Sequence, residues 1–119
     1  MVKVLVVDDE IEARKELVEF LKKRLDCHFF QADDGYQALE LLKQTQIEVM
    51  ILDLRMPGLS GRDVLKQAKE LNSSLHTIVL SSWDSEEITR EVEKAGAQYI
   101  YKPAASLDFI KDQVQKYLP

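Results

Sequence analysis

Five short runs of apolar residues recur along the chain, separated by longer stretches with helical spacing. The runs are rich in Val, Ile, Leu and aromatic side chains, and several are apolar throughout. Continuous apolar runs of this length are typical of strands that are buried on both faces of a sheet. The predicted strands cover residues 3–7, 27–31, 49–52, 77–80 and 98–101.

Between the runs, apolar residues recur every three or four positions, which is the spacing of one face of an α-helix. A turn at Asp33-Asp34-Gly35 precedes the second helix, and Gly96 stands where a C-cap glycine is expected after the fourth. The predicted buried stripes are Ile11, Leu17, Val18, Leu21 and Leu25; Ala38, Leu41 and Leu42; Val64, Leu65, Ala68 and Leu71; Ile88, Val92 and Ala95; and Leu107, Ile110, Val114 and Leu118.

Five strand–helix units in succession predict an α/β fold with a central parallel sheet and helices on both faces. Right-handed crossovers leave few topologies for such a chain. We expect a flavodoxin-like (βα)5 arrangement with strand order 2-1-3-4-5. The 119 residues suit one compact domain over 1–119.

Composition narrows the classes of function. A formal net charge of -5 argues against direct nucleic-acid binding by this domain. No apolar run approaches the roughly 18 residues of a membrane span, and too few residues precede the first strand for a signal peptide, so we expect a cytoplasmic protein. Cys27 is the only cysteine, which excludes an internal disulfide and favours a buried thiol. His28 and His76 have no metal-ligand spacing with it.

Charged and polar residues follow four of the predicted strands. Asp8 and Asp9 follow the first strand, Asp53 the third, Ser81 the fourth and Lys102 the fifth. In the expected strand order these ends are contiguous, and ligands of such folds bind at the carboxyl ends of the strands. The sequence therefore predicts that these five side chains converge on one edge of the sheet.

The sequence Val4-Leu5-Val6-Val7-Asp8-Asp9-Glu10 carries a core strand straight into a cluster of negative charge. Carboxylates held together cost free energy unless a cation joins them. Mg²⁺ is the natural candidate because it binds one or two carboxylates together with waters.

A carboxylate beside Mg²⁺ and a lysine can act as a nucleophile towards a phosphoryl group. The metal and Lys102 would neutralise the phosphoryl oxygens, and Ser81 would donate a hydrogen bond to one of them.

Each residue also has a simpler interpretation when taken singly. Asp8 or Asp9 alone is more often a helix N-cap, Ser81 could cap a helix that begins near Asp84, and Lys102 could be a surface lysine. Their joint placement at four strand ends favours a shared site.

As a set, these motifs resemble the receiver domain of two-component response regulators, over about residues 3–118. The matching features are an acidic pair, an Asp-x-x-Met-Pro-Gly segment, a strand-end hydroxyl, a Lys-Pro pair and an aromatic residue three positions before the lysine. They are Asp8-Asp9, Asp53-Leu54-Arg55-Met56-Pro57-Gly58, Ser81, Lys102-Pro103 and Tyr99.

The resemblance implies a role for each matching residue. Asp53 would accept the phosphoryl group from a sensor histidine kinase or a histidine phosphotransfer protein. Asp9, Asp53 and the backbone carbonyl of Arg55 would bind Mg²⁺ directly, and Asp8 mainly through water. Lys102 would bind the phosphoryl group.

The resemblance also implies a switch with weak autophosphatase activity rather than a metabolic enzyme. Ser81 would move towards the phosphoryl group and Tyr99 would turn inward. The face of helix four, strand five and helix five would then control an effector protein or an attached output domain. The Lys102-Pro103 bond is expected to be cis, as is usual in this family.

Two further features bear on the lifetime of the phosphoryl group and on a partner surface. Arg55 and Trp83 occupy positions that tune the phosphoryl lifetime, where the long cation and the indole would shield Asp53 or stack on each other, slowing self-dephosphorylation. Tyr101 and Phe109 are expected to form an exposed aromatic patch.

Other classes of protein fit the sequence less well. A flavodoxin-like electron carrier would need a phosphate-binding loop after the first strand, where Asp8-Asp9-Glu10 would repel the phosphate. A phosphatase or mutase with an Asp nucleophile would carry an Asp-x-Asp motif at one strand end. Here the segment reads Asp53-Leu54-Arg55, with an arginine in place of the second aspartate. A pseudo-receiver, which binds partners without phosphorylation, would be favoured by loss of an acid, the hydroxyl or the lysine.

Overall fold

A computed structural model of the chain describes residues 1–55, 58–83 and 85–119, so Met56, Pro57 and Asp84 lie outside the described residues. The strands are β1 (Val2–Val7), β2 (Cys27–Ala32), β3 (Val49–Asp53), β4 (His76–Ser81) and β5 (Gln98–Tyr101). The helices are α1 (Ile11–Lys22), α2 (Gly35–Gln44), α3 (Gly61–Leu71), α4 (Glu86–Lys94) and α5 (Leu107–Gln115), and the 3-10 turn η1 (Lys102–Ala104) follows β5. The predicted strands are confirmed, with bounds that differ by at most one residue at either end.

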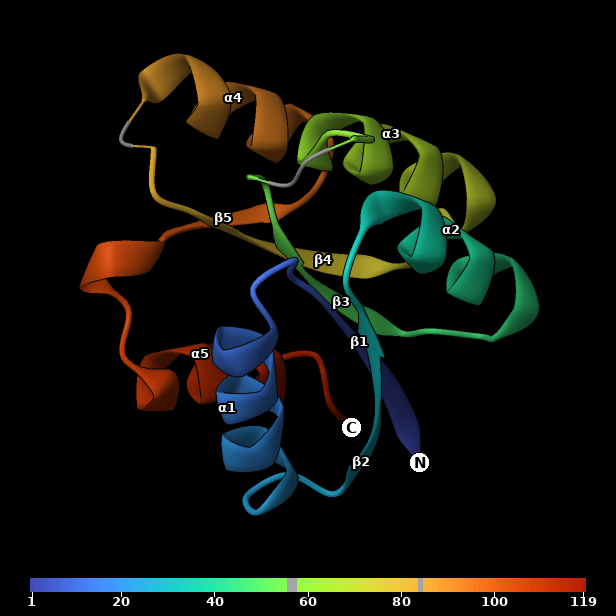
Figure 1. Cartoon of the computed structure of the whole chain (residues 1–119), viewed down its shortest axis with the longest axis vertical. Helices are drawn as coiled ribbons and strands as arrows, with labels where there is room; N and C mark the ends of the chain where they lie inside the picture. Colours follow the sequence, from blue (N-terminus) through green and yellow to red (C-terminus); the bar gives the residue numbers. More distant parts are fainter. Residues whose placement is uncertain (56–57, 84) are drawn as a thin grey trace.

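The strands run parallel in one sheet, in the order β2-β1-β3-β4-β5 (Figure 1). This confirms the predicted fold and its topology. From β1 the chain moves outward to β2, and it then crosses back to β3 and continues outward on the other side through β4 and β5. The strand order therefore reverses between β1 and β3, which is where ligands of such sheets bind.

Helices cover both faces of the sheet, and each face has its own apolar core. α1 and α5 pack on one face, and α2, α3 and α4 pack on the other (Figure 1). Successive residues of β1 alternate between the two cores, with Leu5 in one and Val4 and Val6 in the other. Burial on both faces is the reason why the central strands are apolar throughout. No helix in the described part of the chain is long and apolar enough to cross a membrane.

Helix ends are fixed by polar caps and by one glycine. Four helices begin after a side chain that accepts a backbone N–H from the first turn, and these caps are Asp34, Ser60, Ser85 and Ser106. After α4, Gly96 has a φ of +80° and donates its N–H to the Glu93 carbonyl, while Ala97 donates to the Val92 carbonyl. This pair of bonds is the Schellman motif, so the predicted C-cap role of Gly96 is confirmed.

Two residues of the predicted buried stripes are exposed. Ile11 and Leu71 are the first residue of α1 and the last residue of α3. The helical spacing assigns both to the apolar face, but a helix terminus projects past the part of the face that the sheet covers. The prediction of a buried thiol is also wrong, because Cys27 lies on the edge strand β2 and is only half-buried.

The peptide bond between Lys102 and Pro103 is trans, so the expectation of a cis bond is wrong. Pro103 lies in the first turn of η1. The fixed φ of proline and its missing N–H are tolerated at the start of a helical turn, where the N–H has no partner within the turn.

Gly61 allows α3 to pack directly on the chain that leaves β3. A Cβ at this first residue of α3 would lie 2.5 Å from the Leu54 Cα, which is too close for any side chain. Only glycine therefore fits here without a shift of the backbone.

We predict that Gly61→Ala lowers the free energy of unfolding by about 1–3 kcal/mol, because overpacking a tight contact has a cost of that size. The sign of this change tests the contact, because without a clash alanine would stabilise the helix relative to glycine by ~1 kcal/mol. Urea denaturation measures the change. Gln67→Ala, an exposed change on the same helix, should stay within about 0.5 kcal/mol. An unchanged or higher stability for Gly61→Ala would contradict the close packing.

Candidate functional site

Four of the predicted site residues stand at the carboxyl edge of the sheet. Asp53 ends β3 and Ser81 ends β4, while Asp8 and Lys102 follow directly after β1 and β5. The strands are parallel, so these positions lie at one edge, where the loops leave the sheet (Figure 1). The parallel topology therefore brings residues from sequence positions 8 to 102 to the same edge of the sheet.

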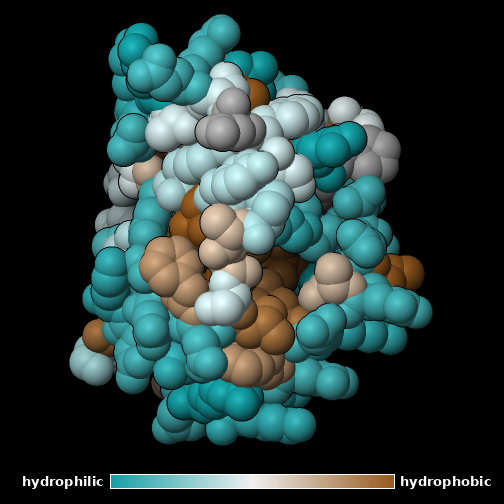
Figure 2. All heavy atoms as spheres, turned by 90° about the vertical axis from the view of Figure 1, so that its left-hand side faces the viewer, coloured by the Kyte–Doolittle hydropathy of each residue, from teal (hydrophilic) through white to brown (hydrophobic). Residues whose placement is uncertain are grey.

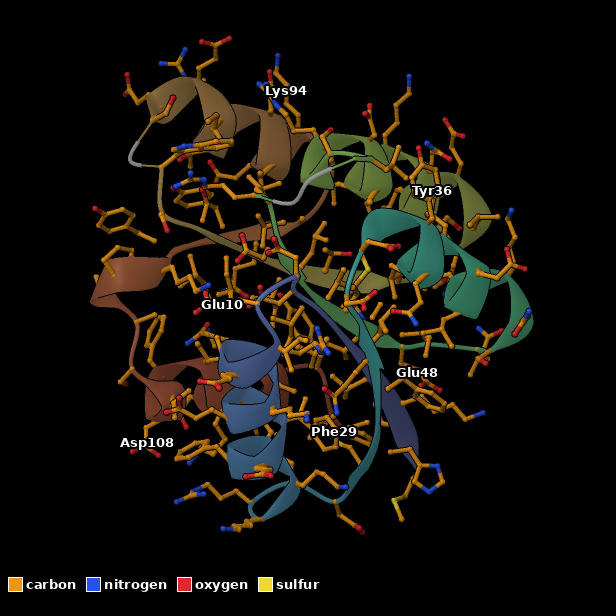
Figure 3. The ribbon with its side chains drawn as sticks, in the orientation of Figure 1. Glu10, Phe29, Tyr36, Glu48, Lys94 and Asp108 are labelled. Atoms are coloured by element: carbon orange, nitrogen blue, oxygen red, sulfur yellow. The ribbon has the colours of Figure 1, made fainter. Side chains whose placement is uncertain are left out.

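The Lys102 ammonium lies between two buried carboxylates. Its Nζ donates to Asp53 Oδ2 at 3.0 Å and lies 3.7 Å from Asp8 Oδ2. The second oxygen of each carboxylate accepts a backbone N–H from two residues further on, Glu10 for Asp8 and Arg55 for Asp53, both at 2.9 Å. Figure 3 shows Glu10 in the loop that joins β1 to α1. One side-chain cation and two N–H groups therefore hold the two carboxylates in place.

Burial and the neighbouring charges together raise the pKa values of Asp8 and Lys102. Burial raises the pKa of Asp8, and the charges of Asp53 and Asp9 add to the effect, although the Glu10 N–H and Lys102 oppose it. Burial lowers the pKa of Lys102, but the hydrogen bond to Asp53 and the charges of Asp53 and Asp8 outweigh it, so the pKa is raised. Lys102 is therefore held protonated, while ionised Asp8 lies in surroundings that favour an additional cation.

The third predicted carboxylate, Asp9, stands apart from this pair. Asp9 is exposed, and residues 1–55, 58–83 and 85–119 contain no group of three or more Asp, Glu, His or Cys side chains arranged to hold a metal ion. Asp9 therefore does not lie with the other two carboxylates in this conformation, and its role as a metal ligand stays a prediction. Asp8 contacts Lys102, while Asp9 stands at a bend of the loop after β1 and faces solvent.

The remaining oxygen donors still fit Mg²⁺. Proteins usually hold this ion through one or two carboxylates, and waters and substrate oxygens complete its shell. Asp8 and Asp53 supply the two carboxylates, and each has lone pairs beyond those used by its N–H and ammonium partners.

The predicted switch residues Ser81 and Tyr99 both bond to the backbone of Trp83. Ser81 is fully buried, and its Oγ accepts the Trp83 N–H at 3.0 Å. The Tyr99 hydroxyl donates to the Trp83 carbonyl. The segment after β4 is thus fixed on both sides of one residue. The cap of α4 is Ser85, which rules out the simpler interpretation of Ser81 as that cap.

Arg55 and Trp83 stack across the top of the site. The guanidinium carbon of Arg55 lies 5.6 Å from the centroid of the Trp83 ring, within the range of a cation–π contact. This confirms the expected stacking. Trp83 is 40% exposed and Arg55 is exposed as well, so the stacked pair lies at the surface, two residues after Asp53 and two residues after Ser81 in the sequence.

The model of the family described as response regulator receiver domain matches residues 4–114. The chain belongs to this family. It is a receiver domain of two-component response regulators, a signalling domain whose role is to act as a phosphorylation switch.

Relatives of full length support this assignment of the receiver domain. Sporulation initiation phosphotransferase F of Bacillus subtilis (strain 168) is 31% identical over 117 residues, which cover 98% of this chain and 94% of that protein. The receiver domain of the Francisella response regulator 1452 has 30% identity and a TM-score of 0.89, with 98% of this chain and 96% of that chain covered.

A third relative, the response regulator TrrA of Thermotoga maritima, was solved in complex with Mg²⁺-BeF. It has 29% identity and a TM-score of 0.86, with 99% of this chain and 100% of that chain covered. Several other curated relatives are longer, and the receiver domain spans 21% to 48% of their length.

The predicted aromatic patch of the receiver domain lies beside η1. Tyr101 and Phe109 are 38% and 44% exposed. Together with Ala104 and Ala105 they line an open hollow of about 250 Å³. Figure 2 shows apolar side chains gathered in the middle of one side of the molecule and bordered by hydrophilic ones. The expectation that both aromatic side chains are exposed on one surface is therefore confirmed.

Sequence analysis does not single out one buried residue of the receiver domain, Arg14. Its guanidinium Nη1 donates to the Asp8 carbonyl, in the loop that carries the acidic pair. A signal was present in the sequence, since Arg14 stands three positions before Leu17 on the apolar stripe of α1. A charged residue on an apolar helical face is rarely buried unless a specific partner holds it.

We predict that Asp8→Asn raises the free energy of unfolding of the receiver domain in chelator-treated buffer by about 0.5–2 kcal/mol, because residues of functional sites often lower the stability of a protein. Asparagine can still accept the Glu10 N–H, while one buried charge next to Asp53 is removed. Urea denaturation measures the change. Asp33→Asn at an exposed position should stay within about 0.5 kcal/mol. A loss of stability for Asp8→Asn would show that the attraction to Lys102 outweighs the cost of burial.

Proposed function

We propose that Asp53 accepts a phosphoryl group and that this modification switches the receiver domain between two signalling states. The contact between Lys102 and Asp53 carries the proposal, because it sets a phosphoryl-binding ammonium 3.0 Å from a buried carboxylate at the ligand-binding edge of the sheet. The donor is a phosphohistidine on a sensor histidine kinase or a histidine phosphotransfer protein. The name of the Bacillus subtilis relative, a phosphotransferase, supports a transfer of this kind.

The transfer itself is a nucleophilic displacement on phosphorus. A carboxylate oxygen of Asp53 attacks the phosphorus and forms an O–P bond, while the N–P bond of the phosphohistidine breaks and its electron pair returns to the imidazole. Lys102 already contacts Asp53 Oδ2. During the transfer its ammonium binds the phosphoryl oxygens and neutralises their negative charge. The Arg55 N–H keeps Asp53 Oδ1 in place during the reaction.

The proposed metal is Mg²⁺, which when bound supplies positive charge next to the phosphoryl oxygens. Asp53, Asp9 and the Arg55 carbonyl would hold it directly once the exposed Asp9 side chain turns towards Asp53, and Asp8 would act through water. The raised pKa of Asp8, caused first by its burial, supports a place for an additional cation. The Thermotoga maritima relative that was solved with Mg²⁺-BeF supports the same ion.

The switch follows from a competition for hydrogen bonds at Trp83. A phosphoryl group on Asp53 offers the Ser81 hydroxyl a charged acceptor, so Ser81 releases the Trp83 N–H and moves towards the site. Tyr99 then releases the Trp83 carbonyl and turns inward. The new charge biases a two-state equilibrium, and the face of α4, β5 and α5 presents the result to an effector protein or an attached output domain.

The phosphorylated state is reversible because an aspartyl phosphate is a mixed anhydride that water can hydrolyse. The domain therefore has weak autophosphatase activity of its own and turns over no metabolite. Arg55 and Trp83 are exposed and contact each other close to Asp53 in the sequence, and in this proposal the pair restricts the approach of water to Asp53, which slows this reset. The cytoplasmic location expected from the sequence remains a prediction.

Intact-mass spectrometry tests the acceptor. We predict that the chain gains one phosphoryl group when it is incubated with Mg²⁺ and a small acyl phosphate, and that Asp53→Asn abolishes the gain. Asp63→Asn, an exposed change in α3, is the matched control and should label like the parent chain. Chelation of the metal should prevent labelling. A parent chain that gains no mass would favour a pseudo-receiver, which uses the same edge of the sheet only for partner binding.

The lifetime of the phosphoryl group tests the pair of Arg55 and Trp83. We predict that Trp83→Ala raises the rate of self-dephosphorylation about two- to fivefold, which corresponds to the 0.5–1 kcal/mol of an exposed cation–π contact. Loss of phosphorylated mass with time gives the rate. Arg55→Ala should add little to Trp83→Ala in a double-mutant cycle, since either change breaks the same contact. Additive effects would show that the two side chains act separately.

A further inference from the structure

Arg14 carries a permanent charge into the interior beneath the acidic loop. The residue is only 9% exposed. Its side chain donates to two neutral acceptors, the Asp8 carbonyl at 2.5 Å and Gln31 Oε1 at 3.0 Å. In the described part of the chain no carboxylate forms an ion pair with it. A buried guanidinium without a paired carboxylate is costly, so a structural apolar residue would serve this position better unless the bonds to the loop matter.

The bonds of Arg14 hold the chain on both sides of Asp9. Its guanidinium bonds to the Asp8 carbonyl, and its backbone N–H donates to the Glu10 carbonyl at 3.0 Å. The Asp8 N–H is fixed in turn to the Ala32 carbonyl of β2 at 3.1 Å. Exposed Asp9 therefore stands in a segment whose two neighbouring peptide groups are anchored. The bond to the Glu10 carbonyl is the first backbone bond of α1, so the bond to the Asp8 carbonyl is the anchor that depends on the side chain of Arg14.

From this arrangement we propose that Arg14 is a positioning residue for the metal ligands. It fixes the backbone of residues 8–10, so that the Asp8 and Asp9 carboxylates can meet a divalent cation at a small entropic cost. Groups that orient metal ligands contribute to affinity without touching the metal. The inference rests on the proposed function, because it assigns Arg14 a part in the proposed Mg²⁺ site.

The geometry distinguishes this role from two simpler ones. If only the positive charge of Arg14 mattered, its loss would strengthen the binding of a cation, and lysine would replace it fully. If Arg14 only filled the core, its loss would lower stability and leave the affinity for Mg²⁺ unchanged. A positioning role requires the two-armed guanidinium, because a lysine ammonium cannot bridge the Asp8 carbonyl and Gln31 in the same way.

The test is a calorimetric titration with Mg²⁺ alone, made on Arg14→Lys, Arg14→Met and Gln31→Ala. Gln31 is exposed, so the last variant removes one anchor of the guanidinium without emptying the core. Lys15→Met, an exposed change of the same charge on α1, is the control. We expect the dissociation constant to rise about 10-fold for both Arg14 variants, as for other residues that orient metal ligands, to rise less for Gln31→Ala, and to stay unchanged for the control.

A second readout needs no metal. Amide hydrogen exchange at Glu10, whose N–H bonds to Asp8 Oδ1, should accelerate in the Arg14 variants and not in Lys15→Met. Thermal unfolding shows that each variant is folded at the temperature of the titration. Unchanged Mg²⁺ affinity in the folded Arg14 and Gln31 variants, or tighter binding by Arg14→Met, would overturn the assignment of Arg14 alone. A parent chain that binds no Mg²⁺ would overturn the proposed metal site and this inference with it.

Discussion

Asp8 and Asp53 share one edge of the sheet because Lys102 places an opposite charge between them. The two buried carboxylates contact the same ammonium and repel each other, and burial adds to the free-energy cost of keeping Asp8 ionised. The ammonium arrives from the far end of the sequence, on the turn that follows β5. The strand order, the two cores and the short loops all serve to bring these three side chains together, so the site depends on the whole fold.

A continuous set of contacts leads from this cluster towards the surface. Asp53 accepts the N–H of Arg55, the Arg55 side chain stacks on Trp83, and the Trp83 backbone bonds to Ser81 and Tyr99. Tyr99 lies on β5, next to the exposed hollow beside η1. We propose that a change in charge at Asp53 acts on these hydrogen bonds, which also fix Trp83 in the segment that follows β4. Trp83 is the residue at which these contacts meet.

The strands and the residues at their ends could be predicted because periodicity and parallel topology follow directly from the residue pattern. Several of the predictions that were wrong concern burial, which depends on where a residue lies within the fold. Ile11 has the right spacing but stands at a helix terminus, and Cys27 lies on an edge strand. Asp9 stands at a bend of the loop after β1 and is exposed, whereas its neighbour Asp8 is buried, and the residue pattern does not show where that loop bends. Arg14 escaped notice because a sequence does not show that a loop carbonyl will bond to a buried guanidinium.

Trp83 is the only tryptophan and lies against Arg55, so its fluorescence reports on the site directly. The most direct measurement follows this signal as Mg²⁺ and then beryllofluoride, a phosphoryl mimic, are added to the parent chain and to Asp53→Asn. We expect one change with Mg²⁺, a further change with beryllofluoride, and loss of the second change in the variant. A second change of equal size in Asp53→Asn, or none in the parent chain, would contradict a phosphoryl switch at Asp53.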